Sequence, residues 1–206
     1  MDLKEKAKNI KLLVVDVDGT LTNGDYQVNE DGKVSKSFYT RDFHYIEKIL
    51  KMGDYPMCVL LLTSSWDNCI VSKYTKLSYC DRWNFLLKVN SIDKRKYIEE
   101  EIIDVKNESP FSIVHCGVGY CERKVIEKKH PYSNVFSRIS WDNIAYIGDS
   151  ENDLESMKLA AITGCPQDAE DEVKEECHFV SMYNGGRGAV ADFIKYLISL
   201  RENNNG

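Results

Sequence analysis

The segment Leu12–Thr22, LLVVDVDGTLT, decides the expected fold of this 206-residue chain. Leu12–Val17 is an apolar, valine-rich run, as expected of a β-strand that is buried on both faces of a parallel sheet. Asp16 and Asp18 stand two residues apart, so they leave the strand end on the same side. Ionised carboxylates at a buried strand end are costly unless a cation offsets them, and Gly19 permits a sharp turn with close approach to a ligand. The segment therefore predicts a strand that delivers two acids to a cation or phosphate site.

Outside this segment, strand-like runs alternate with helical patterns. The other apolar runs are Met57–Leu62, Phe85–Val89, Phe111–Val114, Ile144–Ile147 and His178–Met182. Apolar residues recur at helical spacing after Asp42 (the expected helix cap), Ser65, Asp93 and Ser150, and in a last helix that contains Phe193–Ile198. This alternation predicts an α/β fold with a mainly parallel central sheet, whose functional residues lie at the carboxyl ends of the strands.

One segment breaks the alternation directly after the first strand. Tyr26–Val28 and Lys33–Val34 are β-like arms on either side of Asn29–Gly32, and Asp31 followed by Gly32 is a strong turn signal. We expect a β-hairpin there, placed so that it can cover the site as a flap.

The composition fits one globular domain, residues 1–206, and excludes several classes of protein. The net charge of −6 gives no basic surface for nucleic acid, and no apolar run approaches the roughly 18 residues of a membrane span. The lysine-rich start has no signal-peptide core, and the seven cysteines contain no CxxC pair. A metal cluster of His115, Cys116, Cys121 and His130 is disfavoured by its spacing. We expect a cytoplasmic protein with a frayed tail at 202–206.

A second acidic cluster, GDSEND at residues 148–153, follows the Ile144–Ile147 run. Asp149 at this strand end can face Asp16 across the sheet and complete a site for Mg²⁺, which prefers carboxylate, water and phosphate oxygens. The alternative is a plain helix start, because Ser150 and Asp153 form a capping-box pattern.

Polar side chains also follow the second strand, where Thr63 precedes Ser64 and Ser65. A hydroxyl group and backbone amides at a helix N-terminus suit a phosphate group. Simple capping of the helix is the alternative interpretation of this cluster.

Taken together in this order, the three strand-end clusters resemble the haloacid dehalogenase (HAD) superfamily of phosphohydrolases. DVDGTLT is similar to the first motif of that family, Thr63 to the second and GDSEND to the fourth. The resemblance implies a Rossmann-like fold in which Asp16 is the nucleophile and Asp18 the general acid and base. It also implies Mg²⁺ held by the Asp16 side chain, the Asp18 backbone carbonyl and Asp149, with Asp153 as an outer-sphere or alternative ligand.

The chain further resembles the capless sugar-acid phosphatases, which include 3-deoxy-D-manno-octulosonate 8-phosphate phosphatase and domains attached to acylneuraminate cytidylyltransferases. The likeness lies in the hairpin, in SFYTRD at 37–42, in CPQDA at 165–169 and in GGRGAV at 185–190. It implies no large cap domain, a phosphorylated sugar or sugar acid as substrate, and a homotetramer in which neighbours complete the site. Gly19, Ser64, Arg41 and Arg187 are the expected substrate contacts, since guanidinium groups pair well with carboxylate or phosphate.

Three features depart from that pattern. Phe43 stands where a glycine usually follows Arg-Asp, and Ser64-Ser65 replaces a usual Gly-Arg, so a basic substrate contact is missing. The span from Asn90 to Ile144 also exceeds one βαβ unit of roughly 30 residues, which predicts an insertion at about 103–140.

The third-motif lysine has two candidates. Lys94 follows Asp93 at the start of a helix with clear periodicity, whereas Lys124 follows another apolar run and lies closer to Asp149. Only one of them can place its ammonium on both Asp16 and the phosphate. We favour Lys94, which puts the insertion after it.

The expected function is therefore a Mg²⁺-dependent phosphomonoesterase that acts on a small phosphate ester through an aspartyl phosphate. A phosphoryl-accepting signalling receiver also uses an acid, Mg²⁺, a hydroxyl and a lysine, but it would lack the acid/base position of Asp18. A catalytically silent binding or oligomerisation module, and a nucleotidase or phosphomutase of the same superfamily, are the remaining alternatives.

Overall fold

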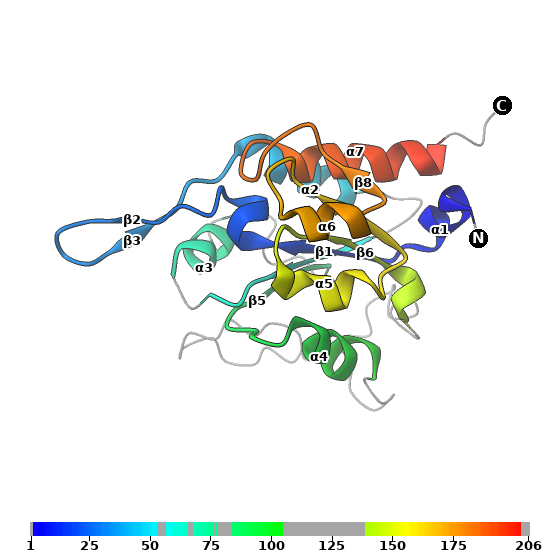
Figure 1. Cartoon of the computed structure of the whole chain (residues 1–206), viewed down its shortest axis with the longest axis horizontal. Coiled ribbons are helices and arrows are strands. Elements are labelled where there is room, and N and C mark those ends of the chain that lie inside the picture. Colours follow the sequence, from blue (N-terminus) through cyan, green and yellow to red (C-terminus); the bar gives the residue numbers. More distant parts are fainter. Residues whose placement is uncertain are drawn as a thin grey trace.

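The chain forms a three-layer α/β sandwich, in which helices cover both faces of one six-stranded sheet (Figure 1). The computed structural model describes residues 2–52, 57–65, 68–75, 77, 84–104 and 139–202. The strands are β1 Leu12–Asp16, β2 Gln27–Val28, β3 Val34–Ser35, β4 Cys58–Leu62, β5 Phe85–Lys88, β6 Ile144–Ile147, β7 Ile162–Cys165 and β8 Phe179–Val180. The α-helices are α1 Leu3–Asn9, α2 Thr40–Leu50, α3 Asn68–Thr75, α4 Lys94–Ile98, α5 Glu151–Met157, α6 Asp171–Glu176 and α7 Ala189–Glu202. Three short turns of other helix types are Val17–Leu21, Glu99–Ile103 and Trp141–Asn143.

The central sheet has the strand order β5-β4-β1-β6-β7-β8, and every neighbouring pair is parallel. Strand β1 is the central partner of β4 on one side and β6 on the other, so the chain reverses its direction of winding there. Such a switch point at the carboxyl ends of the strands is where ligands bind in open α/β sheets.

Burial on both faces explains the apolar sequence of β1. Leu13 and Val15 belong to the core beneath α2 and α7, whereas Leu12 and Val14 belong to the core beneath α4 and α5. Figure 1 shows these two pairs of helices on opposite sides of the sheet. The predicted mainly parallel sheet is confirmed.

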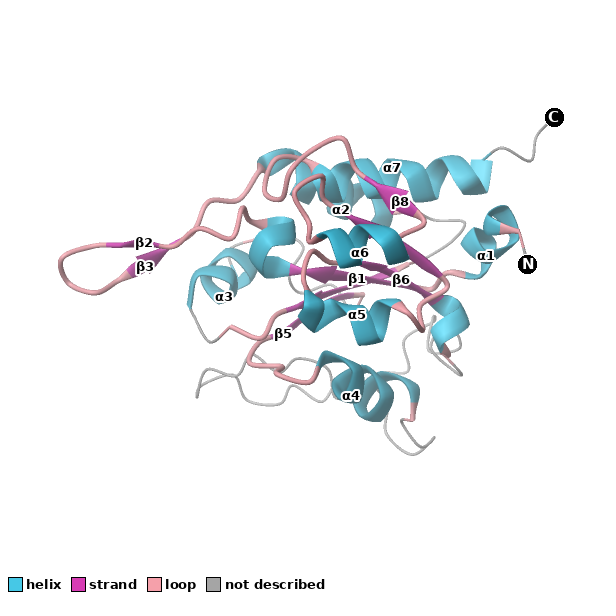
Figure 2. Ribbon diagram, viewed as in Figure 1, coloured by secondary structure: helices cyan, strands magenta, loops and turns pink. Residues whose placement is uncertain are grey.

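The predicted hairpin is also confirmed, as the antiparallel pair of β2 and β3. Gly32 has a φ of 74°, which an L side chain rarely adopts, and its amide donates to the Asn29 carbonyl at 2.9 Å. Figure 2 shows the hairpin projecting from the sandwich on the side of α3.

Some elements differ from the sequence prediction. Strand β7 was not expected, because its sequence ITGC is short and of mixed polarity, and α1 and α6 were likewise missed. Helix α2 begins at Thr40 with Tyr39 as its cap, so the expectation that Asp42 caps this helix is wrong. The predicted strand Phe111–Val114, the predicted helix end at Gly53 and most of the predicted insertion lie outside the described residues.

Asp42 instead joins α2 to α7. Its Oδ1 accepts a hydrogen bond from the backbone N–H of Ala191, in the first turn of α7, at 2.8 Å. Its Oδ2 is buried without a hydrogen-bond partner in the described part of the chain. Burial raises the pKa of Asp42 to about 6, although the helix amides and the Arg41 charge act in the opposite direction.

Replacing Asp42 with Asn tests this arrangement. The folded pKa of about 6 exceeds the unfolded value of about 3.9, so the folded protein binds more protons between these values. The contribution of Asp42 to stability therefore falls as pH rises through this window. Relative to the native protein, Asp42→Asn is expected to gain up to about 2 kcal/mol in unfolding free energy between about pH 4 and about pH 7. Urea denaturation at both pH values measures this, with the exposed Asp31→Asn as control, and an unchanged difference would contradict it.

Candidate active site

The expected site residues gather at the carboxyl ends of the three adjacent strands β4, β1 and β6. Asp16 is the last residue of β1, Thr63 follows β4 and Asp149 follows β6 by two positions. Since these strands are parallel neighbours, their ends lie at one edge of the sheet. The fold thus brings together residues that are far apart in the sequence.

A wide turn after β1 gives the loop its shape. The backbone N–H of Thr22 donates to the Val17 carbonyl at 2.9 Å, and Gly19 has a φ of 89°. A Cβ on Gly19 would lie 2.1 Å from a carboxylate oxygen of Asp149. Glycine is required here both for its backbone conformation and for the close approach of Asp149.

The glycine-rich segment after β8 supports the same turn from outside. The backbone N–H of Gly186 donates to the Thr20 carbonyl at 3.0 Å, and a Cβ on Gly185 would lie 1.8 Å from the carbonyl oxygen of Gly19. The segment therefore has a role within a single chain, where it holds the loop that carries the acids.

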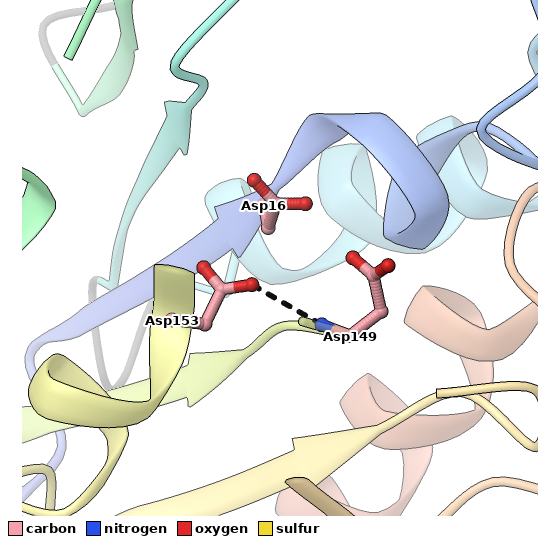
Figure 3. Close-up of side chains that lie close together, drawn as sticks. All are labelled: Asp16, Asp149 and Asp153. Carbon is pink, nitrogen blue, oxygen red and sulfur yellow. Dashed lines mark hydrogen bonds between the residues drawn. The ribbon is translucent and has the colours of Figure 1, made fainter. Parts of the chain in front are cut away.

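Three carboxyl groups converge at the strand ends. Asp16, Asp149 and Asp153 each present an oxygen within 4.8 Å of those of the other two. Figure 3 shows them approaching from β1, from the loop after β6 and from α5. Carboxylates so close together repel one another unless a cation lies between them or one binds a proton.

Lys94 supplies one positive charge to this cluster. Its ammonium contacts Oδ1 of Asp16 and lies 2.7 Å from Oδ1 of Asp153, and all three side chains are almost completely buried. Asp93 accepts a hydrogen bond from the Lys96 backbone N–H at 2.8 Å and so caps α4, as its position before the expected helix predicted. Lys124, the rival candidate, lies outside the described residues.

One ammonium does not balance three carboxylates, and the pKa values reflect this. Burial and the neighbouring Asp153 raise the pKa of Asp16 well above its usual value, despite the attraction of Lys94. The same two causes raise the pKa of Asp149 to about 6. Although burial opposes its charge, Lys94 has a raised pKa because it faces Asp16 and Asp153. The site therefore favours the addition of positive charge.

Asp153 differs from the other two acids because both of its oxygens already accept hydrogen bonds. Oδ1 accepts from Lys94 and from the buried Tyr146 hydroxyl, each at 2.7 Å. Oδ2 accepts from the backbone N–H groups of Asp149 at 3.2 Å and Ser150 at 3.4 Å, and the capping box that the sequence predicted is present. Asp153 thus ties Lys94 and the Asp149 loop to the start of α5.

Asp18 lies apart from this cluster, in a different environment. Its Oδ2 accepts from the Thr63 hydroxyl at 2.7 Å, and its Oδ1 forms an ion pair with the ammonium of Lys36. Burial acts to raise the pKa of Asp18, but the hydrogen bonds from Lys36, Ser65 and Thr63 outweigh it and lower the pKa. The two acids of the first motif therefore have pKa values shifted in opposite directions.

The expected substrate contacts are more dispersed. The Ser64 hydroxyl donates to the Ser91 carbonyl at 3.0 Å. Arg41 is exposed and its guanidinium lies 5.8 Å from the centre of the Tyr39 ring, and Arg187 is also exposed. Neither arginine forms an ion pair with an acid in the described part of the chain.

Three residues of the site were missed from the sequence. Thr20 donates from its hydroxyl to Oδ1 of Asp149 at 2.9 Å, and it lies inside the first motif, so its position was a usable signal. Tyr146 lies on β6 three residues before Asp149, where an aromatic residue in a buried strand looks like core. Lys36 lies on the hairpin arm, and no pattern in the sequence links it to Asp18.

Comparison with known proteins gives the family. The sequence profile described as haloacid dehalogenase-like hydrolase matches residues 64–194, and this chain belongs to that family. The matched range includes Lys94, Asp149 and Asp153, whereas Asp16 and Asp18 precede it. The resemblance inferred from the strand-end motifs is confirmed.

Curated relatives are of two kinds. N-acylneuraminate cytidylyltransferase A of Danio rerio is 24% identical over 199 residues, which are 97% of this chain and 37% of that protein. This chain thus spans little more than a third of the length of that relative. The 3-deoxy-D-manno-octulosonate 8-phosphate phosphatase KdsC of Yersinia pestis is 24% identical over 207 residues, which are 100% of this chain and 88% of that protein.

Solved structures show the same fold. The 3-deoxy-D-manno-octulosonate 8-phosphate phosphatase of Moraxella catarrhalis, in complex with magnesium, phosphate and KDO, aligns with a TM-score of 0.71 at 19% identity. The alignment covers 98% of this chain and 92% of that one. The cobalt-bound deoxy-D-mannose-octulosonate 8-phosphate phosphatase of Haemophilus influenzae aligns with a TM-score of 0.68 at 20% identity, over 95% and 91% of the two chains.

The central role of Lys94 can be tested through stability. Lys94→Met removes the ammonium and leaves the acids unbalanced, so it should cost about 3–5 kcal/mol of unfolding free energy in metal-free buffer. Adding Asp153→Asn should recover part of this loss, because it removes one of the facing charges. Urea denaturation measures both. Lys96→Met is the control, since the Lys96 ammonium has only an exposed partner, Glu100 at 3.9 Å. A loss for Lys94→Met as small as that of this control would contradict the account.

Proposed function

We propose that the protein is a Mg²⁺-dependent phosphomonoesterase that forms an aspartyl phosphate on Asp16 and acts on a phosphorylated sugar acid. The observation that carries the proposal is the placement of Asp16 at the switch point of the sheet, beside Lys94 and Asp149, with Asp18 two residues further on. Membership of a hydrolase family adds to it.

The donor set fits a hard divalent cation. Asp16 and Asp149 are acids whose pKa values are raised by burial and by Asp153, so a cation near them would relieve a real excess of negative charge. Their oxygens and the backbone carbonyl of Asp18 would hold Mg²⁺. Asp153 would position them without direct coordination, since both of its oxygens are already engaged. Bound there, Mg²⁺ would offset the charge of the phosphate and of the attacking carboxylate.

The reaction then needs two steps from the chain's own residues. An oxygen of Asp16 attacks phosphorus in line as the bond to the leaving oxygen breaks, and Asp18 gives its proton to that oxygen. Asp18 next takes a proton from water, whose oxygen attacks phosphorus. The aspartyl phosphate bond breaks, and phosphate and the free Asp16 carboxylate are restored. Lys94 fixes Asp16 throughout and, with the Thr63 hydroxyl, binds phosphoryl oxygens.

The class of substrate follows from the relatives. The Yersinia pestis relative, which this chain covers almost fully, is named for a phosphorylated sugar acid, and so is the Moraxella catarrhalis structure. Phe43 and the Ser64-Ser65 pair depart from that group, so we propose the class and no single compound. The departures predict a leaving group that is bound by fewer cations.

We also propose a homo-oligomer, and specifically a tetramer, in the cytosol. The hairpin exposes Tyr26 at 53%, Val28 at 64% and Val34 at 38%, an apolar set that a second copy would cover. Among the described residues no helix is both long and apolar enough to span a membrane. Analytical ultracentrifugation should show a species larger than the monomer, and Val28→Asp should reduce its mass. A native monomer that hydrolyses a sugar phosphate efficiently would contradict the assembly.

Asp16→Asn tests the nucleophile. An amide is too weak a nucleophile, so turnover of phosphorylated metabolites should fall by more than about 10⁴-fold while the far-UV spectrum stays native. The matched control is Asp31→Asn, an exposed acid at the hairpin tip, which should retain full activity. Substantial activity in Asp16→Asn would refute the assignment.

Metal dependence is tested by removal and return. EDTA should abolish turnover and added Mg²⁺ should restore it. Asp149→Asn should raise the Mg²⁺ concentration for half-maximal activity by at least the roughly tenfold that weaker, outer-shell changes produce. Full activity in EDTA would exclude the proposed role of the acidic cluster.

A further inference from the structure

Lys36 is a buried cation on an otherwise exposed hairpin. The residues on either side of it, Ser35 and Ser37, are exposed, but its own side chain is 1% exposed. It crosses the Tyr26 ring, with the ammonium 4.6 Å from the ring centre, and ends on Oδ1 of Asp18. The hairpin thus sends one charged side chain inward, to a residue of the proposed reaction.

This arrangement is expensive unless it has a purpose at Asp18. Immobilising a lysine side chain costs up to about 2 kcal/mol in entropy, and removing an ammonium from water costs several kcal/mol more. An exposed lysine would give the hairpin solubility without either cost.

Anchoring of the hairpin does not require Lys36. The hydroxyls of Tyr26 and Ser65 share a hydrogen bond of 3.2 Å, which ties the first arm to the loop after β4. The thiol of Cys69, in α3, donates to the Val34 carbonyl at 3.2 Å, which ties down the second arm. The hairpin is therefore fixed at two other points, and the Lys36 ion pair is available to act on Asp18.

At Asp18 the two partners hold the carboxyl group from both sides. Lys36 contacts Oδ1 and the Thr63 hydroxyl contacts Oδ2, so rotation of the group would break at least one of these bonds. Proton transfer requires this orientation, because the oxygen of Asp18 must come within hydrogen-bond reach of the leaving oxygen and then of water.

We propose that Lys36 is a positioning residue, delivered by the hairpin of the same chain, that orients Asp18 for proton transfer. The inference rests on the proposed phosphatase function. It makes the hairpin part of the active site of its own chain, in addition to any contact it makes with another copy.

The leaving group of the substrate separates positioning from general damage. Phosphoryl transfer from p-nitrophenyl phosphate expels a weak base and needs little proton donation, whereas an alkyl or sugar phosphate needs a proton from Asp18. Lys36→Met keeps the stem and removes the charge. It should lower kcat/KM for a sugar phosphate by about 10²-fold and for p-nitrophenyl phosphate by less than about threefold. Lys33→Met, at an exposed lysine on the same hairpin, should change neither.

A second variant removes the ambiguity of misfolding and of direct substrate binding. In an Asp18→Asn background, Lys36→Met should change kcat/KM for the sugar phosphate by less than about twofold, because the residue that it positions is no longer functional. Equal losses for the two substrates, an undiminished sugar phosphate activity, or independent effects of the two substitutions would overturn the proposal. If the native protein hydrolysed neither substrate, the proposed function itself would fail.

Discussion

The ion pair network of Lys94 with Asp16 and Asp153 is the interaction on which the site depends. It lies almost wholly out of water, between the central strand β1 and the helix α5. Without the ammonium, three carboxyl groups would face one another in an environment that disfavours their charge. Everything that positions Lys94 serves this contact: β5 pairs with β4, Asp93 caps α4, and the helix then starts with its lysine directed at the end of β1.

The two acids of the first motif occupy opposite environments only two residues apart. Asp16 faces the acidic cluster and has a raised pKa, whereas Asp18 faces the hairpin and Thr63 and has a lowered one. The turn through Gly19 creates this division, since it separates the side chains as the strand ends. Two lysines from distant parts of the chain then serve the two acids separately. Different protonation behaviour in one short segment is what a nucleophile and a proton carrier require.

The sequence was informative where local pattern and strand-end position coincide. Asp16, Thr63 and Asp149 follow apolar runs that are indeed adjacent parallel strands, so their meeting could be predicted from the fold class alone. Strand β7 could not, because the state of ITGC is set by its neighbours β6 and β8 and by Phe193, which packs where a Cβ on Gly164 would lie. Lys36 was equally hidden, since its contact depends on how the hairpin docks, through Tyr26 and Val34, on residues far along the chain. The choice of Lys94 rested on helix periodicity, which also governs its placement in the structure.

The central claim is that Asp16 becomes covalently phosphorylated, and trapping that species tests it most directly. The Asp18→Asn variant, mixed with Mg²⁺ and a sugar phosphate and quenched in acid, should carry one phosphoryl group by intact mass. Borohydride reduction should then convert Asp16, within the peptide that contains Leu12–Thr22, to homoserine. A phosphoryl group on another residue, or efficient hydrolysis of the ester with no covalent species under any quench time, would contradict the account.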